Sequence, residues 1–156
     1  MKKVNKKVIK VLTDVYTAEI GAIGIYMDQH TKCADRGYKK LAEMLKNDAV
    51  EEMKHAEKLA ERILFLGGEV AFQKHSVPDV KQTEIIHMIK QNIDIEDEAI
   101  VRLNGGIATC FSEGDNGSRI LLDEILKDEE KHLDELQIIH DNIKKYGDQY
   151  IVTHLM

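Results

Sequence analysis

Apolar side chains recur at helical spacing in four long stretches of this chain. In the first stretch, the positions spaced alternately by three and four are occupied by Ile9, Leu12, Tyr16, Glu19, Ile23, Tyr26 and His30. This alternation is the spacing of one buried helix face. Because burying an unpaired carboxylate is costly, we expect Glu19 to have a partner. At the end of the same face, His30 has no equivalent in the second half of the chain, and we expect it to be a satisfied histidine at the edge of the core.

The other three stretches have the same pattern, and each is again interrupted by charged or imidazole side chains. The second face consists of Leu41, Met44, Asp48, Glu52, His55, Leu59, Ile63 and Leu66. The third consists of Ile86, Ile89, Ile93, Glu96, Ile100, Leu103, Ile107 and Cys110. The fourth consists of Leu122, Ile125, Glu129, His132, Leu136, Ile139 and Ile143. The chain is therefore predicted to be all-α, with four long helices in one domain over residues 1–156.

The second helix also has another row of apolar or small residues about a quarter turn from the first. This row consists of Leu45, Ala49, Met53, Ala56 and Ala60. One apolar face is sufficient for a helix in a monomeric bundle. The second row therefore predicts that this helix packs against another subunit.

The segments between the helices indicate how the bundle is connected. Turns are predicted at 33–37 and at 112–117, and the midpoint of Glu19 and Glu52 falls inside the first turn. The stretch from Gly67 to about Gln82 is long, lacks periodicity and contains Pro78. A connection of this length suits a crossover that runs along the bundle, so that the third helix begins at the opposite end. Gly147 ends the fourth helix, and residues 148–156 are expected to form a short fifth helix.

Composition narrows the classes of protein that remain. The chain is 43% hydrophobic and 32% charged, with a net charge of −6 and no long basic block, which argues against charge-driven nucleic-acid binding. Its apolar runs are shorter than the ~18 residues of a membrane span, and its basic N-terminus lacks the features of a signal peptide. Cys33 and Cys110 have no C-x-x-C spacing and indicate free thiols. We expect a cytoplasmic protein that binds neither nucleic acid nor membrane.

The polar interruptions of the four faces repeat along the chain. Glu and His stand three residues apart at Glu52 and His55 and again at Glu129 and His132, which places each pair on one helix face. Glu19 precedes the first pair by the same distance as Glu96 precedes the second. An offset of 77 residues relates Glu19 to Glu96, Glu52 to Glu129 and His55 to His132. Four carboxylates and two imidazoles in this order predict a carboxylate-bridged dimetal site inside a four-helix bundle.

The chemistry of these side chains limits the metals and the reaction. Carboxylate oxygen and imidazole nitrogen suit hard or borderline divalent cations, and two such cations would neutralise four glutamates. Iron or manganese is expected rather than a closed structural zinc site, although zinc is a possible substitute. Two bridged metals can bind dioxygen or peroxide. Tyr26, on the same face as Glu19, is either a neighbour of the metal ligands or an ordinary core tyrosine.

Over nearly its whole length the sequence resembles the bacterioferritins. The matching residues are Glu19, the run from Asp48 to Glu57, the run from Glu61 to Leu66, Glu96 and the run from Glu124 to His132. The resemblance implies a ferritin-like four-helix bundle with a long crossover between helices two and three and a short C-terminal fifth helix. It also implies that Glu19, Glu52, His55, Glu96, Glu129 and His132 form a ferroxidase centre that holds two irons per subunit.

The same resemblance implies a biological role and further partners. Bacterioferritins are homo-oligomeric shells of 24 subunits built from dimers, which oxidise ferrous iron with dioxygen or hydrogen peroxide and store the ferric mineral. A haem b lies between paired subunits and is bound by one Met from each, a position that Met53 occupies here. A ferredoxin-like reductant is expected to release the iron. Some members carry a His and an Asp on the inner surface, where this chain has Asn47 and Glu51.

Two other functions fit the ligand pattern. One is a dimetal peroxidase or oxidase of the rubrerythrin type on a smaller oligomer, although the C-x-x-C domain of rubrerythrins is missing. The other is a 12-subunit protective shell like the miniferritins, against which the absence of a basic tail argues. The mass of the particle separates the three hypotheses.

Overall fold

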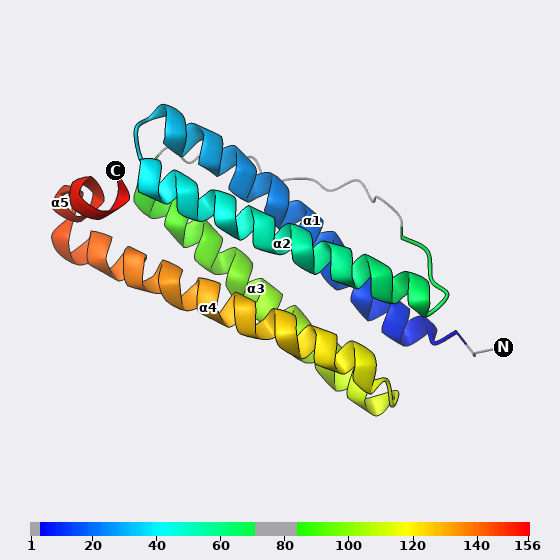
Figure 1. Cartoon of the computed structure of the whole chain (residues 1–156). Coiled ribbons are helices and arrows are strands. Elements are labelled where there is room, and N and C mark those ends of the chain that lie inside the picture. Colours follow the sequence, from blue (N-terminus) through cyan, green and yellow to red (C-terminus); the bar gives the residue numbers. More distant parts are fainter. Residues whose placement is uncertain (1–3, 71–83) are drawn as a thin grey trace.

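Four long helices form a bundle in the computed structural model, which describes residues 4–70 and 84–156 (Figure 1). They are α1 (Lys6–Asp35), α2 (Lys39–Phe65), α3 (Ile85–Ser112) and α4 (Asn116–Tyr146). Helix α1 packs along α2, and α3 packs along α4, while the two pairs meet chiefly through α1 and α3. The predicted all-α, four-helix architecture is confirmed.

The turns after α1 and α3 have the same construction. Gly37 and Gly114 adopt positive φ values of 85° and 71°, a conformation that glycine reaches without steric cost. The residue after each glycine donates its backbone N–H, over 2.9 Å, to the carbonyl of Cys33 or Cys110. Both turns lie where the sequence predicts them, and the 77-residue repeat therefore includes the turns as well as the polar side chains.

The core consists of two apolar clusters, one at each end of the bundle. Cys33 and Leu41 belong to the first cluster together with Ile85, the first residue of α3. Cys110 belongs to the second cluster together with Ile63 near the end of α2. Helix α3 therefore begins at the end of the bundle opposite to where α2 finishes, as predicted, and the two cysteines are free and too far apart to bridge. Most of the predicted crossover lies outside the described residues.

The C-terminal segment closes one end of the bundle. Gly147 ends α4, and it is followed by α5 (Asp148–Tyr150) and a π-helical turn (Ile151–Leu155). Leu155 is buried against the first apolar cluster, which confirms the short fifth helix. Within the described part of the chain, no helix is long and apolar enough to cross a membrane.

The predicted buried faces are correct in outline and differ in detail. Every residue of the predicted α4 face is buried. In α1, however, Val8 and Ala22 are buried whereas Ile9 and Ile23 are only partly covered. Helix α1 contacts both α2 and α3, so its buried face is wider than a single row of side chains.

The expectation that the second row of α2 packs on another subunit is wrong for most of that row. Leu45, Ala49 and Ala56 are 0, 3 and 4% exposed and lie in the core of this chain. Helix α2 packs against α1 on one side and α4 on the other, and it therefore needs two buried faces within a single subunit. Met53 differs from its neighbours in the row because its side chain is 55% exposed.

Candidate metal centre

The six predicted ligands meet in the interior of the bundle, one or two from each long helix. Their exposed fractions are 4% or less. They form two groups in which the ligand atoms lie within 4.8 Å of one another: Glu19, Glu52, His55 and Glu129, and Glu52, Glu96, Glu129 and His132. Glu52 and Glu129 belong to both groups. The structure thus creates two adjacent four-residue sites that share two carboxylates, the arrangement expected for bridging ligands.

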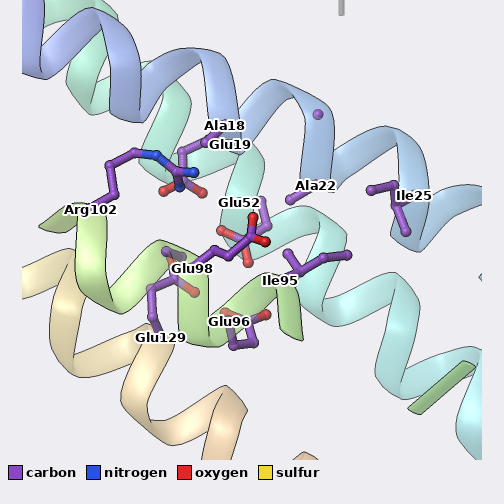
Figure 2. A pocket seen from close by; sticks show the side chains of 12 residues that line it. Ala18, Glu19, Ala22, Ile25, Glu52, Ile95, Glu96, Glu98, Arg102 and Glu129 are labelled. Carbon is purple, nitrogen blue, oxygen red and sulfur yellow. The ribbon is translucent and has the colours of Figure 1, made fainter. Parts of the chain in front are cut away.

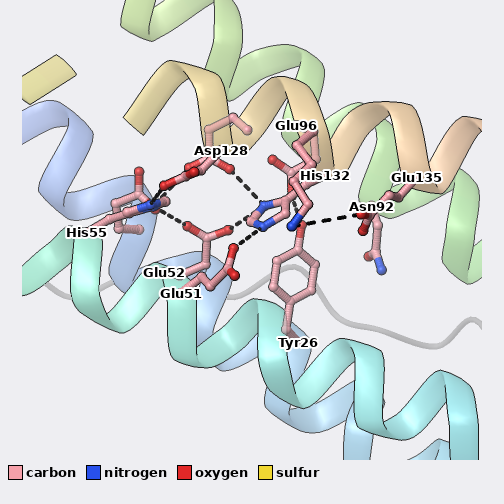
Figure 3. Close-up of polar contacts among 12 residues, drawn as sticks. Tyr26, Glu51, Glu52, His55, Asn92, Glu96, Asp128, His132 and Glu135 are labelled. Atoms are coloured by element: carbon pink, nitrogen blue, oxygen red, sulfur yellow. Dashed lines mark hydrogen bonds and ion pairs between the residues drawn. The ribbon is translucent and has the colours of Figure 1, made fainter. Parts of the chain in front are cut away.

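Both histidines point Nδ1 into the cluster. His55 Nδ1 lies 3.1 Å from Glu52 Oε2, 3.2 Å from Glu129 Oε1 and 3.7 Å from Glu19 Oε2. Figure 3 shows His132 in the corresponding place on the other side of Glu52. Its Nδ1 lies 3.1 Å from Glu129 Oε2, 3.5 Å from Glu52 Oε1 and 3.8 Å from Glu96 Oε1. The 77-residue sequence repeat therefore appears in space as two matching half-sites.

Outside the cluster, a carboxylate holds the second nitrogen of each histidine. His55 Nε2 donates to Asp128 Oδ2 over 3.0 Å, and His132 Nε2 donates to Glu51 Oε2 over 2.7 Å (Figure 3). Such bonds fix the orientation of a ligating imidazole and make its other nitrogen a better donor to a metal. This role of Glu51 and Asp128 was not predicted from the sequence. The signal was present, because Glu51 and Asp128 are also 77 residues apart and each precedes a shared glutamate.

Two further polar contacts join α1 to α3 beside the cluster. The buried Tyr26 hydroxyl donates to Glu96 Oε1, so Tyr26 is a neighbour of the ligands rather than an ordinary core tyrosine. One turn further from the centre, Gln29 and Asn92 exchange two amide hydrogen bonds of 2.8 Å in a fully buried position. His30 stays outside the centre and contacts the Ala42 carbonyl through Nδ1 at 2.7 Å, as predicted.

Burial of so many carboxylates changes the protonation of the cluster. Burial, reinforced by the nearby Glu52, raises the pKa of Glu19 well above its usual value. Burial and the charge of Glu129 raise the pKa of Glu96 to about 9. Burial opposes protonation of His132, but hydrogen bonds to Glu129 and Glu52 outweigh it and raise its pKa to about 12. Without cations, therefore, the cluster takes up protons to offset its buried negative charge.

The donor set also fits a pair of divalent cations. Four carboxylates and two imidazoles are hard or borderline donors, and two divalent cations balance the charge of the four glutamates. Glu129 Oε1 is buried and has no hydrogen-bond partner among the described residues, although His55 Nδ1 lies at 3.2 Å from it. Buried acceptors without partners are rare, and this one lies where a bridging ligand is needed.

A pocket of about 190 Å³ connects the cluster with the surface between α1 and α3 (Figure 2). Four of the predicted ligands line it, namely Glu19, Glu52, Glu96 and Glu129. Small residues on both helices, Gly21, Ala22 and Ala99, line the remainder together with a few larger side chains. Small molecules and ions therefore have a route to the buried carboxylates from this side of the bundle.

Comparison with known proteins identifies the family. The Ferritin-like domain family matches residues 9–146. A bacterioferritin of Desulfovibrio desulfuricans is 36% identical over 145 residues, an alignment that covers 93% of this chain and 80% of that protein. A bacterioferritin of Streptomyces coelicolor is 37% identical over 148 residues, covering 94% and 87%. One of Brucella melitensis is 33% identical over 143 residues, covering 92% and 88%.

The chain belongs to the bacterioferritin family. Membership of this family confirms the resemblance on which the sequence-based assignment rested.

The three positions compared with bacterioferritins above can be located in the structure. Met53 is exposed on the surface of α2 and is not part of the metal cluster. Glu51 is bound to His132, which gives this carboxylate a role inside the subunit. Asn47 is exposed on α2 and is not part of the cluster.

Proposed function

We propose that this bacterioferritin stores iron and that Glu19, Glu52, His55, Glu96, Glu129 and His132 form its ferroxidase centre. The observation that carries the proposal is the pair of half-sites sharing Glu52 and Glu129. Each half-site offers one imidazole, one carboxylate of its own and two shared carboxylates. This donor set accepts two ferrous ions side by side, and the pocket between α1 and α3 supplies their route.

The reaction at this centre converts two Fe(II) to two Fe(III). The two electrons reduce dioxygen, with two protons, to hydrogen peroxide, or reduce hydrogen peroxide, with two protons, to two waters. When iron binds, it supplies the redox chemistry, whereas the protein supplies position and charge. Asp128 and Glu51 hold the imidazoles in place, and Tyr26 holds the Glu96 carboxylate.

The proposed product is a ferric mineral inside a hollow shell of 24 copies of this chain. Apolar side chains exposed on the outer face of α2 support an assembly built from dimers, since Met53 and Leu64 are 55 and 59% exposed. We further propose that Met53 and the same residue of a second copy ligate haem b. The exposed position of this thioether is what such a shared site requires.

An aerobic ferrous titration of metal-free protein tests the storage function. Ferric absorbance and iron content per particle are followed as Fe(II) is added. Uptake that continues to hundreds of irons per particle is the expected result. Uptake that stops at about two per chain would contradict storage and would point to a dimetal oxidase or peroxidase.

Variants and particle mass make the test specific. Glu129→Gln removes a shared carboxylate charge and is expected to abolish rapid oxidation, whereas Glu130→Gln, at an exposed neighbouring position, is the matched control.

Mass photometry is expected to show a particle of ~24 chains, and a mass of ~12 chains would favour a miniferritin-like shell.

The haem content per dimer, compared between wild type and Met53→Leu, tests whether Met53 is the haem ligand. An unchanged haem content would exclude Met53 as the ligand.

A further inference from the structure

The route between α1 and α3 has charged side chains at its outer end that the centre itself does not use. Arg102 and Glu98 line the pocket that reaches Glu19 and Glu96. They also line an adjoining hollow on the surface of α3, together with Asp97 and Val101. Since Arg102 and Glu98 belong to both spaces, they lie at the boundary between solvent and the route to the ligands.

The inner part of this route has little to slow a cation. Its walls include Gly21 and Ala22 on α1 and Ala99 on α3, and a Cβ added at Gly21 would have no atom within 4 Å. The inner end presents the carboxylates of the cluster as ligands to an arriving cation. Passage is thus not limited by a tight constriction beside Gly21.

The outer end is different because it carries both signs of charge. Figure 2 shows Arg102 reaching from α3 towards Ala18 and Glu19 of α1, and it is the one cationic side chain among the residues that line the pocket. Arg102 is half-buried, whereas Glu98 is exposed. Charges in a partly enclosed space are screened less than charges in open solvent, and both act over the ~8 Å of a Debye length at physiological salt.

We propose that Arg102 and Glu98 form a charge gate that sets the rate at which divalent cations reach the centre. Glu98 draws the cation from the surface hollow, and Arg102 repels it on the way in. Dioxygen and hydrogen peroxide are neutral, so neither charge changes the rate at which they pass. The inference rests on the proposed function only in taking the six-residue cluster as the destination of the cation.

Opposite effects of two neutralising variants test this gate. Stopped-flow absorbance follows the binding of Co²⁺ to the metal-free full chain. At low ionic strength, Arg102→Gln is expected to raise the association rate about threefold and Glu98→Gln to lower it by a similar factor. Both rates are expected to converge on the wild-type rate as salt is added, because salt screens the two charges.

Two further variants separate charge from structure. Arg102→Lys keeps the positive charge and is expected to retain the wild-type rate. Lys144→Gln makes the same charge change near the end of α4 and is expected to leave the rate unaltered. If Arg102→Gln leaves the Co²⁺ rate unchanged or lowers it, the gate is refuted. A salt-independent rise in rate would likewise refute it, because that result indicates a change of pocket shape.

The same variants, mixed with Fe²⁺ in air, distinguish failure of the gate from failure of the proposed function. Iron that is oxidised and stored equally fast by all variants refutes the gate and leaves the storage function standing. If the variants change the Co²⁺ association rate as expected but the protein does not oxidise iron, the ferroxidase function is refuted and the gate is supported. Absence of Co²⁺ binding to the wild-type chain would refute both.

Discussion

At the scale of single residues, the centre depends on side chains that do not themselves belong to it. Asp128 and Glu51 each bind the outward nitrogen of one histidine, while Tyr26 donates to Glu96. These contacts place each inward-facing donor atom before any cation arrives. Such preorganisation limits the side-chain freedom that metal binding would otherwise have to remove.

The two outer carboxylates should act on different half-sites. Asp128→Asn weakens the support of His55, and Glu51→Gln weakens that of His132. Each variant is expected to lower the affinity of one of two bound Co²⁺ ions about tenfold and to leave the other nearly unchanged. Titration of the cobalt absorbance measures this, with Glu130→Gln as the exposed control. Equal weakening of both ions by either variant would contradict two separable half-sites.

Asp48, one turn before Glu52, is expected to make stability depend on pH. Burial, partly opposed by the nearby His132, raises the pKa of Asp48 from 3.8 to about 6. Since the folded state binds this proton more tightly than the unfolded state, the ionised carboxylate destabilises the metal-free protein above pH 6. That penalty disappears as the pH falls from about 6 towards 3.8.

Asp48→Asn should therefore raise the free energy of unfolding by about 2 kcal/mol at about pH 8 and have little effect near pH 4. Urea denaturation of the metal-free protein at the two pH values measures the difference. Asp134→Asn, at an exposed position of α4, is the control. A gain for Asp48→Asn that is equal at both pH values would show that the carboxylate charge is not its cause.

At the scale of helices, the distance between neighbouring helices decides at which positions a glycine is required for packing. Gly105 and Gly106 are adjacent in α3, but only Gly106 is buried. A Cβ at Gly106 would lie 2.7 Å from Val11 Cγ1 and 3.0 Å from Leu122 Cδ1. A Cβ at Gly105 would have nothing within 4 Å. Gly105 can therefore accept a side chain, whereas the absence of a side chain at Gly106 lets α1 and α4 pack closely on α3.

The two alanine variants should change stability in opposite directions. Gly106→Ala is expected to lower the free energy of unfolding by about 1–2 kcal/mol, because overpacking exceeds the gain in helix propensity. Gly105→Ala is expected to raise it by up to about 1 kcal/mol, because only the gain in helix propensity remains. Urea denaturation measures both changes. A stabilised Gly106→Ala variant would mean that the contact with Val11 and Leu122 is loose.

At the scale of the whole molecule, three large apolar side chains on one side of α2 are exposed among the described residues. Val50, Met53 and Leu64 are 37, 55 and 59% exposed. Their spacing of three and eleven residues places them along one side of the helix. We propose that this row forms the contact between paired subunits, because exposed apolar rows of this kind are typical of such contacts.

Leu64→Glu is expected to break this contact, because a carboxylate buried between two apolar faces has no partner there. Mass photometry of Leu64→Glu should show that the large particle is lost and that the subunits are monomers rather than dimers. Lys58→Glu changes an exposed residue on another side of α2 and should leave the particle mass unaltered. An intact particle in Leu64→Glu would place the subunit contact elsewhere.

The sequence by itself determined the helices, the turns and the six cluster residues. Periodic apolar positions specify a helix locally, and a polar residue inside such a row is conspicuous without any knowledge of its neighbours. The 77-residue repeat then relates the two halves, because it preserves both turn glycines and all three pairs of predicted ligands.

Only the tertiary structure decided which surfaces meet. Periodicity could not show that Leu45, Ala49 and Ala56 face the interior of the same chain, since that depends on α2 lying between two neighbours. Nor could it show that Asp128 reaches His55 across the bundle, or that small residues leave a pocket beside Arg102. These features arise between helices that are distant in sequence, and local side-chain patterns carry no information about such distances.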